Sequence, residues 1–588
     1  MRLEDLALIG NCQFSALIAR NGSVVWCCLP RFDSEPVFGR ILDESGGEFS
    51  IAPIDGEDGE QRYLGNTNIL ETMFRTNEGR WRVVDFAPRF ERNGEMFRPT
   101  QLVRVVEPLE GTPRVSVRCE PIAGWSKARI DGTAGTDGVV FGDDANGLRL
   151  VTNMPLAHLD GEPFILTRRT YFVLAFGAEP VATPLAAACD QLLLSTTKYW
   201  QRWVKHCNIP PLFQREVIRS ALALKLHYYE ETGAIVAAMT TSIPESAGSG
   251  RTWDYRYCWL RDAYYVLDAL RLLGHFEERE GFTKYLLGIS SQATDMDLHP
   301  LYRVDGSSDL EERILPHWAG FNGDGPVRIG NGAALHQQHD VYGELVLALA
   351  PMFLDQRFEQ ERAPATLDLL ESLARRAIAV VGTPDAGIWE FRRAWEPQTF
   401  SSLMCWAAVD RVARITAEFR PSVAAELRAA ADRIHDDILS KAWSERRGRF
   451  AATYGGDDVD AALLQMVPLR FLSRDDPRLV ATVEAVRDEL SHNGWLLRYR
   501  TDDGLGVPSV AFVICTFWLA DALALIGQTD EAQRIMARVR EVLSPTGLMS
   551  EDCDIASRRL WGNYPQAYSH VGLIHAAFAS SSRWSEFL

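Results

Sequence analysis

The first third of the chain alternates apolar and polar positions, as strands with one buried face do. Segments 71–88 and 99–122 follow this period of two, and turns rich in Gly, Pro and Asn separate them. Segment 164–177 has the pattern of the last long strand of this region. Many short strands without intervening helices predict an antiparallel β-sandwich, to which we assign residues 1–184.

The period changes to that of a helix near residue 185. Residues 185–212 are predicted to form a helical linker, and residues 213–588 a domain of long helices. Such a run of helices predicts stacked hairpins, either closed into a ring or open as an α-solenoid. No short repeat is visible, which disfavours solenoids with a strong consensus. The clearest helical segments are 215–231, 366–382, 400–419, 422–443 and 531–543.

Composition and charge narrow the class of protein. The chain has 588 residues, enough for two or three domains, and 46% of them are hydrophobic. A net charge of −18 repels phosphate backbones and anionic membrane surfaces, so we expect neither nucleic acid nor a membrane as a partner. The most apolar stretch, 509–527, is interrupted by Asp521 and is shorter than the roughly 20 apolar residues of a membrane span, so it predicts a buried helix.

Cysteine usage and the N-terminus indicate an intracellular setting. Ten cysteines are spread along the chain without a CxxC pair, which argues against a zinc ribbon and against a disulfide framework. The first residues lack the basic and apolar regions of a signal peptide. We therefore expect reduced thiols, a cytoplasmic location, and neither a metal nor another cofactor.

An aromatic and charged cluster occupies residues 251–263. Flat aromatic rings bind the apolar face of a pyranose, and neighbouring Asp and Arg groups satisfy its hydroxyls. An Arg–Asp network that holds the start of a helix explains the same residues, and composition does not separate the two interpretations. The side chains concerned are Trp253, Asp254, Tyr255, Arg256, Tyr257, Trp259, Arg261 and Asp262.

Glu390 stands between Trp389 and Phe391, just before a long helical segment. A carboxyl group among apolar rings has its charged form disfavoured, so we expect a raised pKa, as a general acid near neutral pH requires. A surface glutamate on a loop is the other interpretation of this residue taken alone.

A second acidic group comprises Glu551, Asp552 and Asp554. A solvated turn, a metal site and a catalytic base compete here. The metal site is the weakest of the three, because the spacing does not match an EF-hand loop and no histidine lies at a metal-ligand spacing. We expect polar surroundings to leave Glu551 ionised.

Residues 309–332 combine carboxylates with His317, Trp318 and Arg328 on a Gly-rich segment. The segment is not a phosphate-binding loop, because it lacks the GK[ST] ending and a preceding strand.

Five blocks in the same order resemble glycoside hydrolase family 15, the family of glucoamylases and bacterial trehalases. They are WDYRYCWLRDA, PVRIGN, GIWE, MCWAAVDR and GNYPQAYSHVGLI, and segment 8–42 resembles the N-terminal domain of the bacterial trehalase type. The resemblance implies a β-sandwich followed by an (α/α)6 toroid catalytic domain, with the active site in the funnel of the ring.

The resemblance also implies an activity and a set of roles. It implies an inverting, exo-acting α-glucoside hydrolase that releases β-glucose from the non-reducing end of trehalose or of malto- or isomalto-oligosaccharides. Glu390 would be the general acid and Glu551 the general base, and a small carbohydrate the partner; a homo-oligomer stays open. Arg261 and Asp262 would clamp the non-reducing glucose. The other expected substrate-binding residues are Trp253, Tyr257, Trp318, Arg328, Trp389 and Arg392.

Some positions depart from the pattern of bacterial relatives, which carry Asn at position 252 and Glu-Gly at 509–510. These departures leave the outer glucose subsite, and with it the natural substrate, open. A catalytically weak carbohydrate-binding or regulatory protein on the same scaffold is the alternative, and the presence of both Glu390 and Glu551 argues against it. A phosphorylase would need an anion pocket in place of the base, where Glu551 would repel phosphate. The departing residues are Thr252, Ser509, Val510, His336 and His339.

Overall fold

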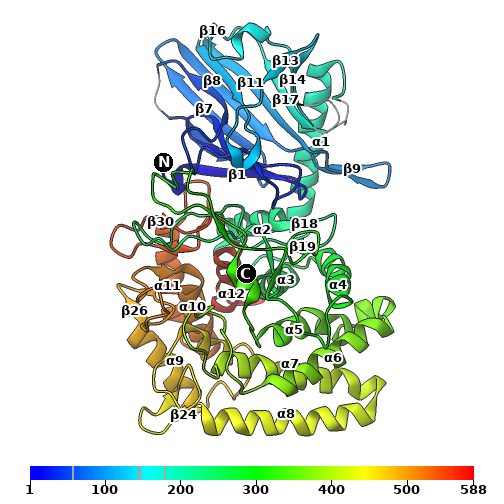
Figure 1. Ribbon diagram of the computed structural model, residues 1–588, viewed down its shortest axis with the longest axis vertical. Coiled ribbons are helices and arrows are strands. Elements are labelled where there is room, and N and C mark those ends of the chain that lie inside the picture. Colours follow the sequence, from blue (N-terminus) through cyan, green and yellow to red (C-terminus); the bar gives the residue numbers. More distant parts are fainter. Residues whose placement is uncertain (56–57, 143–146, 178–180, 588) are drawn as a thin grey trace.

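A computed structural model describes residues 1–55, 58–142, 147–177 and 181–587. A β-rich region, drawn in blue and cyan in Figure 1, lies at one end of the molecule, and a helical body makes up the rest. Helix α1 (Leu185–Lys205) follows the β-rich region in the chain, at the position where the sequence predicts a helical linker. The boundaries at 184/185 and 212/213 stay predictions as domain limits.

The β-rich region consists of two antiparallel sheets that share one core. Phe49 of one sheet meets Phe172 of the other edge to face, with 6.0 Å between ring centroids. The first sheet has the order β1 (Leu6–Gly10), β2 (Ser15–Ala19), β3 (Ser23–Cys28), β5 (Glu48–Pro53), β12 (Arg114–Glu120) and β16 (Phe164–Ile165), with β4 (Pro36–Phe38) paired to β3. The second has the order β13 (Gly132–Ala134), β14 (Gly138–Phe141), β15 (Leu148–Thr152), β17 (Thr170–Phe176), β11 (Gln101–Gly111), β8 (Gly79–Phe86), β7 (Leu70–Thr76) and β6 (Glu60–Tyr63).

The period-two segments form strands, with one correction. Segment 71–88 covers most of the β7–β8 hairpin, and segment 99–122 contains β11 and β12. Segment 164–177 is not one long strand, because polar residues 167–169 separate β16 from β17 and the chain passes there from the first sheet to the second. A small separate hairpin is formed by β9 (Phe90–Arg92) and β10 (Glu95–Phe97).

Six inner elements of the helical body contact one another in a closed order: α3, α5, α7, the short 3-10 helix η6, α10 and α12, which contacts α3 again. Each has an outer neighbour, respectively α4, α6, α8, α9, α11 and α2. Helix α10 confirms the buried helix predicted within 509–527. The bounds are α2 (Gln214–His227), α3 (Leu260–Leu272), α4 (Glu277–Ser290), α5 (Val341–Leu354), α6 (Pro364–Val380), α7 (Thr399–Phe419), α8 (Pro421–Lys441), η6 (Ala461–Met466), α9 (Pro477–Leu490), α10 (Val513–Leu525), α11 (Thr529–Val539) and α12 (Ala567–Ser580).

The two parts of the chain are packed against each other. One apolar core includes Leu6 and Trp26 of the first sheet together with residues of most helices. The Trp26 indole donates a hydrogen bond to the carbonyl of Met239 at 2.7 Å. The β-rich region therefore supports the segments that lead into α3.

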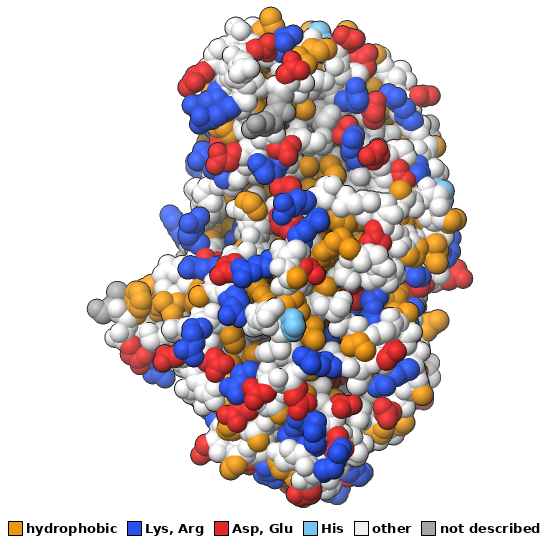
Figure 2. All heavy atoms as spheres, turned by 90° about the vertical axis from the view of Figure 1, so that its left-hand side faces the viewer, with side chains coloured by type: hydrophobic (Ala, Val, Ile, Leu, Met, Phe, Trp, Pro, Cys, Tyr) orange, Lys and Arg blue, Asp and Glu red, His pale blue; other side chains and the backbone are white. Residues whose placement is uncertain are grey.

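The charges on the surface and the state of the cysteines do not point to a particular function. On the face shown in Figure 2, Lys and Arg side chains intermingle with Asp and Glu, so the net negative charge is spread out there. Within the described ranges, no helix is both long and apolar enough to cross a membrane. All ten cysteines are free thiols, and Cys207 is the one that is not fully buried.

Candidate active site

An inner cavity lies where the N-terminal ends of three inner helices meet. Arg261 and Asp262 stand in the first turn of α3, Phe512 caps α10, and Tyr568 lies in the first turn of α12. Helix N-termini carry partial positive charge and unpaired N–H groups, which favours polar ligands there. The lining residues are Ala237, Tyr255, Trp259, Arg261, Asp262, Ile388, Trp389, Glu390, Arg498, Phe512, Trp518, Glu551, Gln566 and Tyr568.

Glu390 is held in a strained and well-defined position. Its backbone has φ of 58°, the left-handed region that a non-glycine residue adopts at a cost of about 1–3 kcal/mol, and such strain concentrates at functional sites. Its Oε1 accepts hydrogen bonds from Trp259 Nε1 at 2.8 Å and from Gln338 Nε2 and Arg261 Nη2, both at 3.2 Å. All three of these hydrogen bonds go to Oε1. In the described part of the chain Oε2 accepts none of them, so it is the oxygen available to a ligand.

The charge of Glu390 differs from the sequence prediction. Burial alone would raise the pKa of this carboxyl group, but the Arg261 guanidinium above all lowers it below its ordinary value. The expected raised pKa is therefore wrong. The aromatic neighbours in the chain suggested an apolar setting, whereas the charged partner comes from α3, 129 residues away.

Glu551 is more deeply buried than Glu390, with a relative exposure of 2%. It precedes β29 (Asp552–Cys553), which pairs with β28 (Ala511–Phe512) and β30 (Leu560–Trp561). A Cβ on Gly562, whose φ is 73°, would lie 2.7 Å from the Cβ of Glu551, so this close approach requires glycine.

The pKa of Glu551 also departs from expectation. Burial first, and then the Glu245 carboxylate, raise the pKa to about 8, against the lowering effect of Arg498. The prediction of polar, solvated surroundings for Glu551 is wrong, since Glu551 and Asp552 are both buried. Of the three acidic residues in this group, only Asp554 has a lowered pKa, because Ser557 donates hydrogen bonds to it. In this structure Glu390 favours the ionised form and Glu551 the protonated form.

Arg261 and Asp262 both line the inner cavity, but their side chains are not paired to each other. Arg261 bridges Asp340 and Glu390, each at 3.2 Å, and its Nε donates to the Tyr568 hydroxyl at 3.0 Å. Burial raises the pKa of Asp262 to about 7, with Arg261 acting in the opposite direction. A buried carboxyl group of this kind is poised to bind a sugar hydroxyl as donor or acceptor.

An outer cavity adjoins the inner one, and Tyr255, Trp389, Glu390 and Arg498 line both. Arg498 pairs with Glu245 at 2.5 Å, and the Trp253 indole donates to Glu245 at 3.3 Å. The outer cavity is lined by Glu245, Arg251, Trp253, Tyr255, Asn331, Ala333, His336, Trp389, Glu390, Arg392, Arg498, Tyr499, Asp503 and Leu505.

Trp253, Trp389 and Arg392 thus line a cavity as their predicted roles require. The Arg392 guanidinium lies over the Trp253 ring, 4.1 Å from its centroid. Arg328 also lies over this ring, at 5.2 Å, but it pairs with Glu312 and is not among the lining residues. Arg328 therefore contacts Trp253 without lining the cavity.

Trp318 and Tyr257, which the sequence predicts as substrate contacts, are not among the lining residues of either cavity. Trp318 is 4% exposed and donates to the carbonyl of Trp125 at 2.8 Å, so it packs the helical body against the β-rich region. The Tyr257 hydroxyl donates to Asp254 at 3.0 Å. Composition could not separate sugar-binding rings from packing rings, because both use the same side chains.

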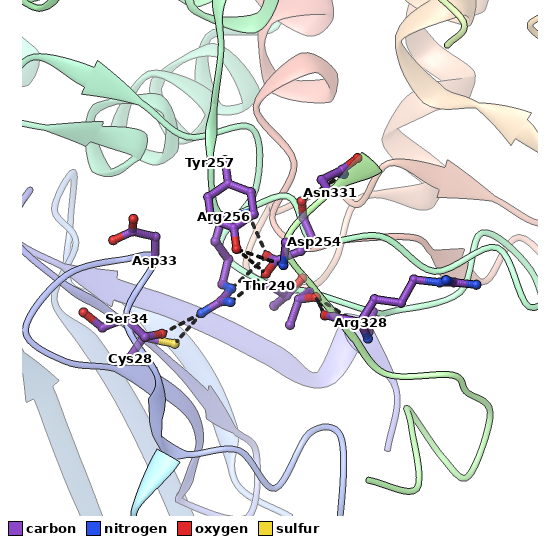
Figure 3. A network of polar contacts seen from close by, with 12 residues as sticks. Cys28, Asp33, Ser34, Thr240, Asp254, Arg256, Tyr257, Arg328 and Asn331 are labelled. Atoms are coloured by element: carbon purple, nitrogen blue, oxygen red, sulfur yellow. Dashed lines mark hydrogen bonds and ion pairs between the residues drawn. The ribbon is translucent and has the colours of Figure 1, made fainter. Parts of the chain in front are cut away.

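The buried ion pair of Asp254 and Arg256 explains part of the aromatic cluster. Figure 3 shows Arg256 between Asp254 and the segment that carries Cys28 and Ser34. Arg256 donates to both oxygens of Asp254, at 2.9 and 2.7 Å, and to the carbonyl of Ser34 at 2.6 Å. Within residues 251–263, structural residues and cavity-lining residues are therefore interspersed, and the interpretation as an Arg–Asp network is confirmed for Asp254 and Arg256.

The five departing positions have different surroundings. His336 lines the outer cavity. Thr252 is buried and donates to the carbonyl of Pro326 at 2.7 Å, and the His339 ring lies 3.3 Å from the Thr383 hydroxyl. Neither these two nor Ser509 and Val510 are among the lining residues.

Several lining residues escaped the sequence prediction. Gln566 and Tyr568 lie inside the block GNYPQAYSHVGLI, so the resemblance of this block to the family could have identified them. Glu245, Arg498 and Asp503 lie outside the quoted blocks, and only the fold brings them to the cavities.

Comparison with known proteins supplies independent information. Glycosyl hydrolases family 15 matches residues 213–578, and the trehalase-like N-terminal family matches residues 1–152. A trehalase of Mycolicibacterium smegmatis is 35% identical, over 98% of this chain and 90% of the relative. Trehalases of Mycobacterium tuberculosis and Thermoplasma acidophilum are 36% and 33% identical, over 98% and 95% of this chain and 89% and 97% of those relatives.

Among solved structures, a bacterial glucoamylase complexed with acarbose matches with a TM-score of 0.66. The match covers 98% of this chain and 93% of that chain at 15% sequence identity. At this identity the likeness concerns the fold: an N-terminal antiparallel β-region followed by a helical domain.

Proposed function

We propose that this chain hydrolyses trehalose with inversion. The chain belongs to glycosyl hydrolase family 15 and is a glycoside hydrolase of the trehalase and glucoamylase type. Full-length similarity to trehalases supports this substrate. The paired contacts of inner and outer elements support the predicted six-hairpin toroid, and the shared core of the two sheets supports the predicted sandwich. Membership of an enzyme family sets aside the alternative of a carbohydrate-binding protein without activity.

The observation that carries the proposal is the position of Glu390 between two adjoining cavities. Trehalose has two glucose units joined by one glycosidic oxygen. With one unit in each cavity, that oxygen would lie at the boundary, beside Glu390. Glu551 lines only the inner cavity, where the anomeric carbon under attack would be.

The roles follow from this placement. Glu390 donates a proton to the glycosidic oxygen, and its Oε2 is the oxygen free to do so. Glu551 takes a proton from the water that attacks the anomeric carbon from the opposite side, which inverts the configuration. An inverting pair needs about 6.5–9.5 Å between carboxyl groups to hold that water. Arg261 and Asp262 bind hydroxyls of the inner glucose by charge-assisted hydrogen bonds.

The number of protons that Glu390 and Glu551 bind together is consistent with these roles. The lowered pKa of Glu390 and the raised pKa of Glu551, about 8, favour one proton on the pair near neutral pH, on Glu551 in this structure. The working arrangement has that proton on Glu390. Binding of a sugar that engages Arg261 would weaken the hold of this guanidinium on Glu390 and favour the working arrangement.

The test is a panel of trehalose, maltose, isomaltose and maltotriose, with product anomers followed by NMR at early times. Inversion of trehalose yields one β-glucose from the inner unit and one α-glucose from the leaving unit. We expect trehalose to have the highest kcat/KM. Two α-glucose molecules as first products would reject inversion, and a higher kcat/KM for maltose would reject trehalose as the preferred substrate.

A further inference from the structure

A short loop, Asp502–Gly506, forms one side of the outer cavity, and we call it the rim loop. Asp503 and Leu505 line the outer cavity. Leu505 is nevertheless 49% exposed, so an apolar side chain stands at the boundary between cavity and solvent. Large apolar side chains at a cavity mouth commonly contact a ligand.

The rim loop is fixed to one side of the outer cavity by a buried clasp. Arg251 donates to both carboxylate oxygens of Asp503, at 2.7 and 2.8 Å, and to the carbonyl of Gly506 at 2.8 Å. The Tyr499 hydroxyl donates to Asp503 at 2.7 Å. Burial alone would raise the pKa of Asp503, but the hydrogen bonds from Arg251 and Tyr499 lower it, so the clasp is ionised.

The loop also approaches a second residue that lines the same cavity. Gly504 and Gly506 have φ of 99° and 101°, and their N–H groups donate to the Asp502 carboxylate at 2.8 and 3.1 Å. A Cβ on Gly504 would lie 3.6 Å from the carbonyl carbon of Arg392. Because Arg251 and Arg392 both line the outer cavity, the rim loop lies beside two residues of its lining.

From these contacts we infer that the rim loop is a wall that limits the outer cavity to a single sugar unit, with Leu505 as its specificity-determining side chain. This inference rests on the proposed function, because it requires a sugar as the leaving group in the outer cavity. Leu505 contacts the apolar face of that sugar. A third unit would have to pass through the position of the loop, so disaccharides are preferred over longer chains.

The experiment compares Leu505→Ala with Val507→Ala, a matched control. Val507 follows the rim loop and is 55% exposed, but it is not among the lining residues. Both positions are exposed, so neither substitution threatens folding. The readout is kcat/KM for maltotriose, for the disaccharide that the wild type hydrolyses fastest, and for α-glucosyl fluoride, which places no sugar in the outer cavity.

For Leu505→Ala we expect the ratio of maltotriose to disaccharide to rise about tenfold, the scale of a few methylene groups in a specificity pocket. The rate on α-glucosyl fluoride should change less than twofold, and Val507→Ala should leave the length ratio within twofold of the wild type. An unchanged ratio in Leu505→Ala, or an equal ratio change in Val507→Ala, overturns the inference. If the wild type prefers maltose over trehalose, trehalose is rejected as the proposed substrate. The ratio of kcat/KM for maltotriose to that for the disaccharide still tests whether the rim loop limits chain length.

Discussion

The inner and outer cavities are built by different means. The inner cavity combines the N-terminal ends of α3, α10 and α12 with loop residues, and its charged groups Arg261, Asp262 and Glu551 are buried. The outer cavity is formed mostly by loops, and Arg392 and Leu505 on its rim are partly exposed. Rigid elements suit the sugar that reacts, whereas loops suit the choice of leaving group. Changes to the inner cavity should therefore affect every substrate, and changes to the outer cavity only those with a second sugar.

The largest effect is expected from the carboxyl pair. Glu390→Gln and Glu551→Gln should each lower kcat on trehalose by about 10²–10⁴-fold, the usual contribution of general acid–base catalysis. On α-glucosyl fluoride, whose leaving group needs little protonation, Glu390→Gln should recover most of its activity and Glu551→Gln should not. Circular dichroism checks the fold. Equal recovery of both variants would contradict the assignment of roles.

A smaller but general loss is expected from Asp262→Ala. In its proposed role Asp262 binds a sugar hydroxyl, so its removal should leave that hydroxyl unpaired, at a cost of about 1–3 kcal/mol, or roughly 5–150-fold in kcat/KM. The loss should be similar for trehalose, maltose and α-glucosyl fluoride. A loss confined to one disaccharide would place Asp262 in the outer subsite.

The pH dependence sharpens the contrast between the two carboxyl groups. Activity requires one proton on the pair. As pH rises through the raised pKa of Glu551, about 8, that proton is lost and kcat/KM should fall about tenfold per pH unit. As pH falls through the lowered pKa of Glu390, the pair gains a second proton and the rate falls again. A kcat/KM profile measures both limbs. Because the charge of Arg498 lowers the pKa of Glu551, Arg498→Gln should move the alkaline limb to higher pH, and a limb that stays at the same pH would argue against Glu551 as its origin.

The smallest effect is expected from a change to Trp253, which lines the outer cavity. Trp253→Phe keeps an aromatic face but loses the hydrogen bond to Glu245, so kcat/KM for trehalose should fall by roughly 2–10-fold, as for one hydrogen bond. α-Glucosyl fluoride should be hydrolysed at the wild-type rate. Steady-state kinetics on the two substrates separates the outcomes, and parallel losses would show that Trp253 acts on the inner cavity.

The order of secondary structure could be predicted from the sequence because periodicity is a local property. Alternation placed β7, β8 and β11, apolar spacing placed α7 and α8, and a continuous apolar stretch placed α10. The prediction failed at 164–177, where a strand pattern continues although the chain changes sheets. The choice between two sheets depends on partners far away in the chain, which alternation does not record.

The sequence by itself determined the family, the enzyme class, the block that contains Glu390 and the acidic group that contains Glu551. Tertiary structure alone decided what each side chain faces. Trp318 and Tyr257 became packing residues because the β-rich region and Asp254 occupy their surroundings. The pKa of Glu390 is lowered and that of Glu551 is raised, the reverse of the sequence expectation, because Arg261 lies beside the first and because burial and then Glu245 act on the second. A pKa depends on charges and burial in three dimensions, and neither can be obtained from neighbours along the chain.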